Sequence, residues 1–247
     1  PKDERWVEIW NNVFMEFNKQ EDGKIVELAS KNVDTGMGLE RVVAVLEATD
    51  DNYQTSIWKE IIESIEKVSG KSYKGNEHSM RIIADHIRTS VFISADPAGI
   101  KPSNTDQGYI LRRLIRRAIR HAKKLGIDTS MDWMEPIALE VIKKYENYYH
   151  EIKENKEVVL EVLRNENTKF NRTLEKGLRE FEKLLNHLDS DTIDKDSAFK
   201  LYDTYGFPIE LTEEMAHEHN LKVDTLGFQE KFKAHQELSR TASKGKF

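Results

Sequence analysis

The sequence contains no cysteine, which excludes a disulfide framework and any metal site with cysteine ligands. It also lacks an apolar run of the roughly 20 residues that a membrane-spanning helix needs. The first residue, Pro1, is not a methionine, and no signal peptide follows it. The last residue, Phe247, lies within a charged stretch. We therefore expect the sequence to be cut from a longer protein at both ends.

The composition indicates a globular, soluble and largely helical chain, since 33% of its 247 residues are charged and 38% are hydrophobic. This length allows one large domain or two modest ones. The formal net charge of −6 argues against a surface that is basic all over. It leaves room for a local basic groove.

The segment between Gly99 and Gly126 predicts the most distinctive helix. Apolar residues such as Leu111 and Ile115 recur in it with a period of 3.6 residues. Basic residues flank this stripe without an intervening carboxylate, which is unusual for a solvated face. Rows of guanidinium groups suit an array of phosphates; the alternative is that they pair with acids elsewhere in this acid-rich chain. The basic residues are Arg112, Arg113, Arg116, Arg117, Arg120, His121, Lys123 and Lys124.

The N-terminal segment predicts a β-hairpin, because β-branched and aromatic residues are dense before a turn at residues 21–24. The return strand is expected at residues 25–28. Glu8 and Asn11 lie three residues apart, on opposite faces of an ideal strand. A bulge or twist would be needed to bring both to one ligand.

Two glycines, Gly36 and Gly38, follow Asp34 closely and predict a turn where the backbone can approach a ligand. The next helix begins with Glu40 and Arg41, and this arginine could reach a polyphosphate near the positive end of the helix. The run is neither a dinucleotide-binding fingerprint nor a P-loop. By itself, a pair of glycines is weak evidence for a ligand-binding site.

The rest of the chain predicts amphipathic helices, and the expected fold class is mostly α with a short N-terminal antiparallel β segment. A polar stretch at residues 71–77 marks the expected boundary between domains 1–70 and 71–247. His217 and His219 lie on different helix faces and make a poor metal pair, so no metal site is expected. Longer helices are predicted at residues 79–94, 135–150 and 158–188, with a turn at residues 151–156.

The run GMGLER, from Gly36 to Arg41, resembles motif 3 of the class II aminoacyl-tRNA synthetases. The longer run VDTGMGLERV, together with EIWNNVFMEF, resembles the alanyl-tRNA synthetase family within that class. Further runs agree in the family's order: RIIADHIR, GIKPSNTDQGYILRRLIRRAIRH and AFKLYDTYGFPIELT. The resemblance covers nearly the whole chain. It implies the end of an aminoacylation core followed by a helical tRNA-recognition domain.

The same resemblance implies an alanine site in the N-terminal segment. Asp34 would pair with the ammonium group of alanine, and Asn11 would hydrogen-bond the amino acid. Gly36 would line the small side-chain pocket, which Val13 would close. A carboxylate beside a glycine suits a small cation, because nothing bulky stands in the way.

ATP and Mg²⁺ are the cofactors that the resemblance implies. Arg41 would contact ATP and share the catalytic role with Asp34, and Glu8 would contact Mg²⁺ or the adenylate. In the family, motifs 1 and 2 precede this region, and motif 2 supplies an arginine for the α-phosphate, so this chain alone is expected to be inactive. The editing domain with its zinc ligands and the oligomerising region would follow Phe247, so no zinc site is expected here. The family also implies a cytoplasmic location.

For tRNA-Ala, the resemblance implies recognition of a G·U wobble pair near the acceptor end. A wobble pair leaves the guanine amine exposed in the wide, shallow minor groove of RNA. Asn104 and Asp203 match the family's residues that contact this pair; without the resemblance, turn and cap roles would be preferred for both. The implied tRNA-binding residues are Asn104, Asp203, Arg112, Arg113, Arg116, Arg117, Arg120 and Lys124.

Two alternatives remain at this point. One is a helical protein-interaction module that kept the synthetase fold and lost RNA binding. The other is a class II enzyme that works alone, against which the absence of motif 2 speaks. Binding to an acceptor minihelix that depends on salt would separate the first alternative from tRNA recognition.

Overall fold

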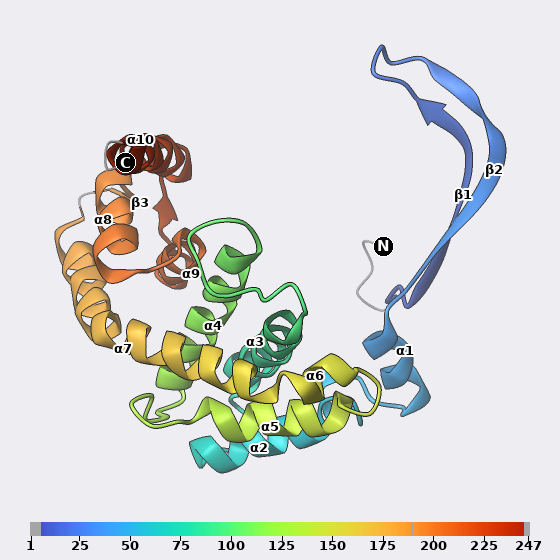
Figure 1. The fold of residues 1–247 in the computed structure, drawn as a ribbon, viewed down its shortest axis with the longest axis horizontal. Coiled ribbons are helices and arrows are strands. Elements are labelled where there is room, and N and C mark those ends of the chain that lie inside the picture. The colour runs from blue at the N-terminus through green and yellow to red at the C-terminus, as the bar shows by residue number, and fades with distance from the viewer. Residues whose placement is uncertain (1–5, 189, 245–247) are drawn as a thin grey trace. The chain divides into compact units, whose positions relative to one another are not determined.

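The computed structural model describes residues 6–188 and 190–244, with side chains described as far as residue 237. The described residues form ten α-helices and two small sheets, which confirms the mostly α-helical class (Figure 1). No described helix is long and apolar enough to cross a bilayer. Contacts divide the chain into two units, residues 1–62 and residues 63–247. The domain boundary after residue 70 stays a prediction.

The first unit is built on an antiparallel hairpin of β1 (Trp10–Lys19) and β2 (Ile25–Met37), drawn in blue in Figure 1. The hairpin itself confirms the prediction. The expected end of the return strand at residue 28 is wrong, because β2 stays paired with β1 until Met37 meets Trp10. Asp34 therefore lies within a strand and not in a glycine turn.

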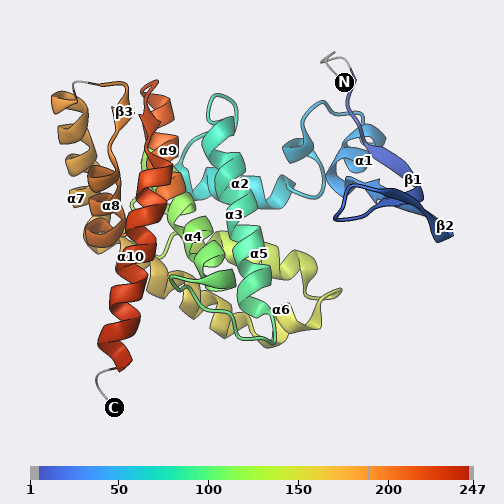
Figure 2. The ribbon, with the colours of Figure 1, turned by 90° about the horizontal axis from the view of Figure 1, so that it is seen from above.

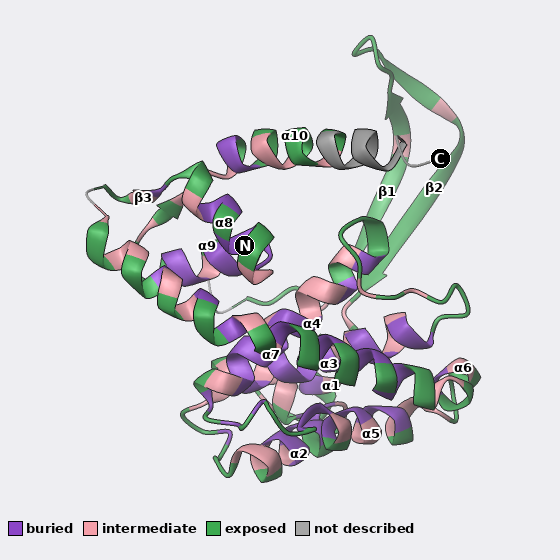
Figure 3. Ribbon diagram, turned by 60° about the vertical axis from the view of Figure 1, so that its left-hand side comes forward, coloured by how far each residue is buried: buried purple, intermediate pink, exposed green. Residues whose placement is uncertain are grey.

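Large apolar side chains of this hairpin are exposed, and the hairpin is green in Figure 3. Phe14 and Phe17, for example, expose 80% and 59% of their surface. The helix α1 (Leu39–Leu46) follows directly and buries Ala44. A short 3-10 helix, η1 (Asn52–Gln54), comes next, and α2 (Lys59–Ser69) crosses the boundary between the units.

The second unit has a core of helices whose inward faces are buried, purple in Figure 3. α3 packs against α4, and the long helix α7 contacts α3, α4 and α5. These contacts place the apolar stripe of α4 in the core, with Leu111 and Ile115 fully buried. The helices are α3 (Glu77–Ala95), α4 (Asp106–Lys124), α5 (Met134–Tyr145), α6 (His150–Glu154) and α7 (Lys156–His187).

The C-terminal part of this unit adds three helices and a two-stranded parallel sheet. α8 contacts both α7 and α10, and Figure 2 shows α10 running beside it. α8 ends at Gly206, whose φ of 73° requires the left-handed conformation that glycine adopts most readily. The elements are β3 (Thr192–Ile193), α8 (Lys195–Tyr205), α9 (Ile209–Glu218), β4 (Lys222–Val223) and α10 (Thr225–Lys244).

The long helix predicted at residues 158–188 is confirmed as α7, and it packs within the unit. Its Gly177 faces Phe207, and a Cβ at that position would lie 2.6 Å from the ring. The predicted helix at residues 135–150 is wrong beyond Tyr145, where the chain turns earlier than the expected turn at 151–156. Tyr145 and Tyr149 both place their rings 5.1 Å from that of Phe92, and this aromatic packing accompanies the turn.

Candidate functional site

Four predicted alanine-site residues lie on neighbouring rungs of the hairpin. Asn11 stands opposite Gly36, and Val13 stands opposite Asp34. Side chains alternate along a strand and directly opposed residues share a face, so all four positions face the same side. A Cβ at Gly36 would lie 3.3 Å from Asn11 Oδ1, so glycine leaves room for this amide. The hairpin thus gathers a carboxylate, an amide and an aliphatic side chain on one exposed face.

Glu8 and Arg41 lie at the end of the same hairpin. Asn11 Nδ2 donates to Glu8 Oε1 at 2.8 Å, and Arg41 Nη1 donates to the Glu8 carbonyl oxygen at 2.7 Å. Glu8 precedes β1, so no bulge is needed to bring its side chain to that of Asn11. The register shift in the hairpin lies farther along, at residues 15–17. The structure therefore joins Glu8, Asn11 and Arg41 in one hydrogen-bonded group.

The basic side chains of α4 meet carboxylates of α9. Basic residues spaced by three or four on α4 face acids spaced by four on α9. These contacts, called here the α4–α9 ion pairs, engage the guanidinium groups directly. Charge-assisted pairs of this length are among the stronger polar contacts. The pairs are Arg113–Glu210 and Arg117–Glu214, each at 2.7 Å, Arg120–Glu218 at 2.6 Å and Lys124–Glu218 at 2.9 Å.

Arg116 occupies a different, buried position. Its Nε donates to Glu166 Oε1 of α7 at 2.6 Å, and its Nη1 donates to the Gly206 carbonyl oxygen at the end of α8. The guanidinium also stands 4.9 Å from the ring centre of Phe170. Arg116 and Glu166 are only 8% and 3% exposed. Arg116 therefore ties three helices together.

These contacts correspond to the alternative interpretation of the basic rows, in which they pair with acids of the same chain. The carboxylates occupy guanidinium donors that a phosphate would need, and Arg116 and Arg120 are buried besides. The role of these residues in tRNA binding stays a prediction. One feature of the sequence could have revealed the pairing, namely the four-residue spacing of the acids. These acids are Glu210, Glu214 and Glu218.

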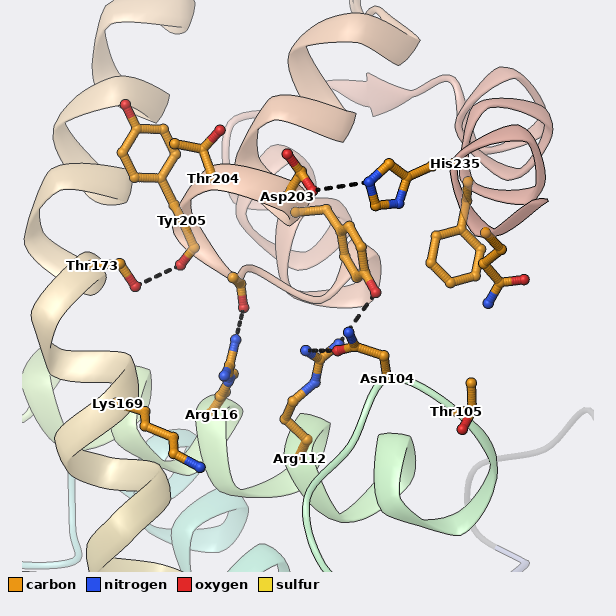
Figure 4. Close-up of a pocket in the computed structure, with 14 residues that line it drawn as sticks. Asn104, Thr105, Arg112, Arg116, Lys169, Thr173, Asp203, Thr204, Tyr205 and His235 are labelled. Carbon is orange, nitrogen blue, oxygen red and sulfur yellow. Dashed lines mark hydrogen bonds and ion pairs between the residues drawn. The ribbon is translucent and has the colours of Figure 1, made fainter. Parts of the chain in front are cut away.

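A cavity of about 540 Å³ brings together Asn104 and Asp203, which are far apart in the sequence (Figure 4). Asn104 comes from the loop before α4, and Asp203 from α8. Arg112 Nη1 donates to Asn104 Oδ1, and Arg112 Nη2 donates to the Tyr202 hydroxyl at 3.4 Å. His235 Nε2 stands 3.7 Å from Asp203 Oδ1. The lining of the cavity thus includes an amide, a carboxylate, and cationic and aromatic groups.

Sequence analysis missed the other polar residues of this cavity. Lys169 and Thr173 come from α7, and His235 and Gln236 come from α10. No local pattern marks them, because they meet the cavity only through the packing of α7 and α10 on α8. The four-residue spacing of Lys169 and Thr173 shows merely that they share a helix face.

Among the described residues, His78, His121 and Glu214 place ligand atoms within 4.8 Å of one another. Two histidines and a carboxylate are a known zinc set. Here His121 Nε2 already bonds Glu214 Oε1 at 2.9 Å, and the Arg117 guanidinium bonds the same carboxylate. The positive charges of Arg117 and Arg120 beside Glu214 oppose a metal ion. The expectation that this segment binds no metal stays a prediction.

Comparison with known proteins gives one consistent result. The family model for class II tRNA synthetases (A) matches residues 1–247. An alanine–tRNA ligase of Borrelia hermsii is 48% identical over 239 residues, covering 96% of this chain and 40% of that protein. One of Treponema pallidum is 44% identical, covering 98% of this chain and 41% of that protein. The chain therefore spans about two-fifths of the length of these relatives.

We expect Arg116→Ala to lower the free energy of unfolding by about 3–5 kcal/mol, because it leaves Glu166 as an unpaired buried charge. Urea denaturation at neutral pH measures this change. The exposed Arg164, which pairs with Asp132 and Glu135, supplies the control, and Arg164→Ala should change stability little. Equal losses in both variants would contradict the structural role of the buried pair.

Stability should also fall with pH below the histidine range. Burial by itself raises the pKa of Glu214, but hydrogen bonds from His121 and Arg117 outweigh it and hold this pKa well below its usual value. Burial lowers the pKa of His121 more than its bond to Glu214 raises it. Both groups thus bind protons more readily in the unfolded state, so stability is full above the unfolded pKa values and is lost as pH falls.

We therefore expect Glu214→Gln to flatten the loss of stability between about pH 5 and 3, where the unfolded glutamate takes up a proton and the folded one does not. Urea midpoints across this range give the slope. Glu213→Gln is the matched control, because burial raises the pKa of Glu213 and its removal should not flatten the curve. If stability falls with pH as steeply in Glu214→Gln as in the unaltered chain, Glu214 is not a source of the pH dependence.

Proposed function

Because this chain belongs to the class II tRNA synthetases (A), we propose that it is part of an alanine–tRNA ligase that activates alanine with ATP and attaches it to tRNA-Ala. Within that enzyme, the second unit recognises the acceptor stem of tRNA-Ala through a G·U wobble pair. The first unit carries part of the alanine and ATP site. The cytoplasm, where protein synthesis takes place, is its expected location.

The observation that carries the proposal is the cavity shared by Asn104 and Asp203. An ionised aspartate only accepts hydrogen bonds, whereas the asparagine amide can donate and accept. The minor-groove edge of a G·U pair offers the unpaired guanine amine as donor, beside acceptors on both bases. Side chains reach this edge because the minor groove of RNA is wide and shallow. Asp203 therefore suits the amine, and Asn104 suits a neighbouring acceptor.

The hairpin residues support the first half of the reaction, in which the alanine carboxylate attacks the α-phosphate of ATP. Asp34 pairs with the ammonium group, while Asn11 and Val13 shape the site beside Gly36. Such a reaction depends on positioning and charge neutralisation more than on a general base.

Arg41 would neutralise phosphate charge in this reaction. Mg²⁺, when bound, supplies further neutralisation, and the Glu8 carboxylate is an oxygen ligand of the kind that it prefers. Glu8 and Arg41 already lie in one hydrogen-bonded group with Asn11. They can therefore act on the same ligand.

A second candidate is a helical protein-interaction module that has lost RNA binding. It is favoured by the α4–α9 ion pairs, which already neutralise most of the basic row. Affinity for an acceptor minihelix, measured at several salt concentrations, separates the two functions. Binding that weakens steadily with salt supports tRNA recognition. Absence of binding to the minihelix at low salt favours the interaction module.

We expect Asp203→Ala and Asn104→Ala to shrink the preference for a G·U over a G·C minihelix by about 1–3 kcal/mol each, the value of a good base contact. Affinity for the G·C minihelix should change little. Asp196→Ala is the matched control, since Asp196 lies on the same helix and pairs with Lys231 away from the cavity. Folded Asp203→Ala and Asn104→Ala chains that keep the full preference would show that other residues contact the pair.

The 247-residue chain by itself should form no alanyl-adenylate. The hairpin contributes Arg41 and Asp34, whereas the family's motif 2, which supplies an arginine for the α-phosphate, has no match in this sequence. ATP–pyrophosphate exchange with alanine measures the reaction, with Asp34→Ala as the background. Exchange above that background would overturn this expectation.

A further inference from the structure

We propose that Arg112 is a positioning residue that fixes the Asn104 amide with its NH₂ group toward the bound base pair. Asn104 then acts only as a donor, and Asp203 only as an acceptor. This inference rests on the proposed function and adds to it the polarity of the two contacts. It also assigns Arg112 a role different from that of the neighbouring arginines.

Arg112 stands in the second turn of α4, and its contacts differ from those of the α4–α9 ion pairs. Its Nη1 donates to Asn104 Oδ1, and its Nη2 donates to the Tyr202 hydroxyl at 3.4 Å (Figure 4). The guanidinium carbon lies 5.4 Å from the ring centre of Tyr109 and 5.7 Å from that of Tyr202. Two aromatic rings and a hydroxyl thus hold the guanidinium in place, and its partner is an amide where Arg113 has a carboxylate.

The chemistry of the guanidinium then decides how the Asn104 amide is oriented. An arginine side chain carries five donor hydrogens and no acceptor, so only the amide oxygen can face it. The opposite orientation would bring the amide NH₂ against the guanidinium, donor against donor. The amide oxygen is therefore engaged, and the NH₂ group is left to point away from Arg112. Asn104 itself is exposed and can meet a ligand.

An asparagine without such a partner can turn its amide and accept from a base as readily as it donates. If Asn104 accepted a hydrogen bond, it and Asp203 would together present two acceptors, which suit two amines. With Arg112 in place, Asn104 and Asp203 together present one donor and one acceptor. That pattern matches a minor-groove edge with one amine and a neighbouring acceptor, as in G·U, and it disfavours edges without an amine.

The experiment uses minihelices in which single groups of the G·U pair are deleted. Inosine in place of guanosine removes the amine, which tests the contact with Asp203. Replacing guanosine by 3-deazaguanosine, or uridine by 2-thiouridine, removes or weakens an acceptor, which tests the donor on Asn104. For the unaltered chain we expect the inosine helix and at least one acceptor-deleted helix to bind roughly 5- to 150-fold more weakly, the equivalent of 1–3 kcal/mol.

Arg112→Met should lose the response to the acceptor deletion and keep the response to inosine. Arg112→Lys, which retains one donor toward Asn104, should keep part of the response to acceptor deletion. Asn104→Asp provides an independent variant, because its carboxylate can still pair with Arg112 but has no donor; it too should lose only the acceptor response. Arg164→Met controls for the removal of one positive charge far from the cavity, and urea denaturation confirms that each variant is folded.

The outcomes separate the two levels of the proposal. In one outcome, the unaltered chain binds the inosine minihelix more weakly, and acceptor deletion weakens binding by Arg112→Met and Asn104→Asp as much as binding by the unaltered chain. The positioning role of Arg112 is then wrong, while tRNA recognition stands. If Arg112→Met weakens all minihelices by the same factor, Arg112 binds phosphate and does not orient Asn104. If the unaltered chain binds every minihelix alike, the proposed function fails and this inference fails with it.

Discussion

Neutralisation of the basic helix α4 by acids of α7 and α9 is the constraint on which the second unit depends. Long side chains join α4 to α9, with little close packing between the two backbones. Like charges on one helix repel, so the row of arginines is stable only when each guanidinium has a partner. The Glu residues of α9 supply these partners at matching intervals. This match of charges contributes to the position of α9 relative to α4, together with the burial of Leu211 and Met215.

The same contacts determine where the cavity residues stand. Asp203 lies three residues before Gly206, whose carbonyl oxygen accepts from Arg116, and Asn104 lies just before the start of α4. A Cβ at Gly206 would lie 2.3 Å from Arg116 Nη1, so the close approach needs glycine at this turn. Arg116 thus holds the end of α8 to α4 through the Gly206 carbonyl oxygen, and it holds α7 to α4 through the buried pair with Glu166.

Local patterns in the sequence predicted most of the fold. The 3.6-residue period found α4 and α7, because this feature depends on neighbours along the chain. Pairing across space was harder: the glycines near Asp34 indicated a turn, yet β1 holds that segment as strand. The partners of the basic row were missed for the same reason. Residues Lys169 and His235, which line the cavity, carry no local mark at all.

Charge balance also bears on how an RNA would be selected by this unit. Because the basic helix is largely neutralised by acids of the same unit, the long-range attraction of this unit to phosphates is weak. Under the proposed function, discrimination then falls to short-range contacts with base edges, which carry sequence information that phosphates lack. Such contacts require donors and acceptors held in fixed orientations, since a side chain free to rotate serves right and wrong bases alike. In the network of Arg112, Asn104 and Tyr202, two aromatic rings and two hydrogen bonds restrain the guanidinium from several sides.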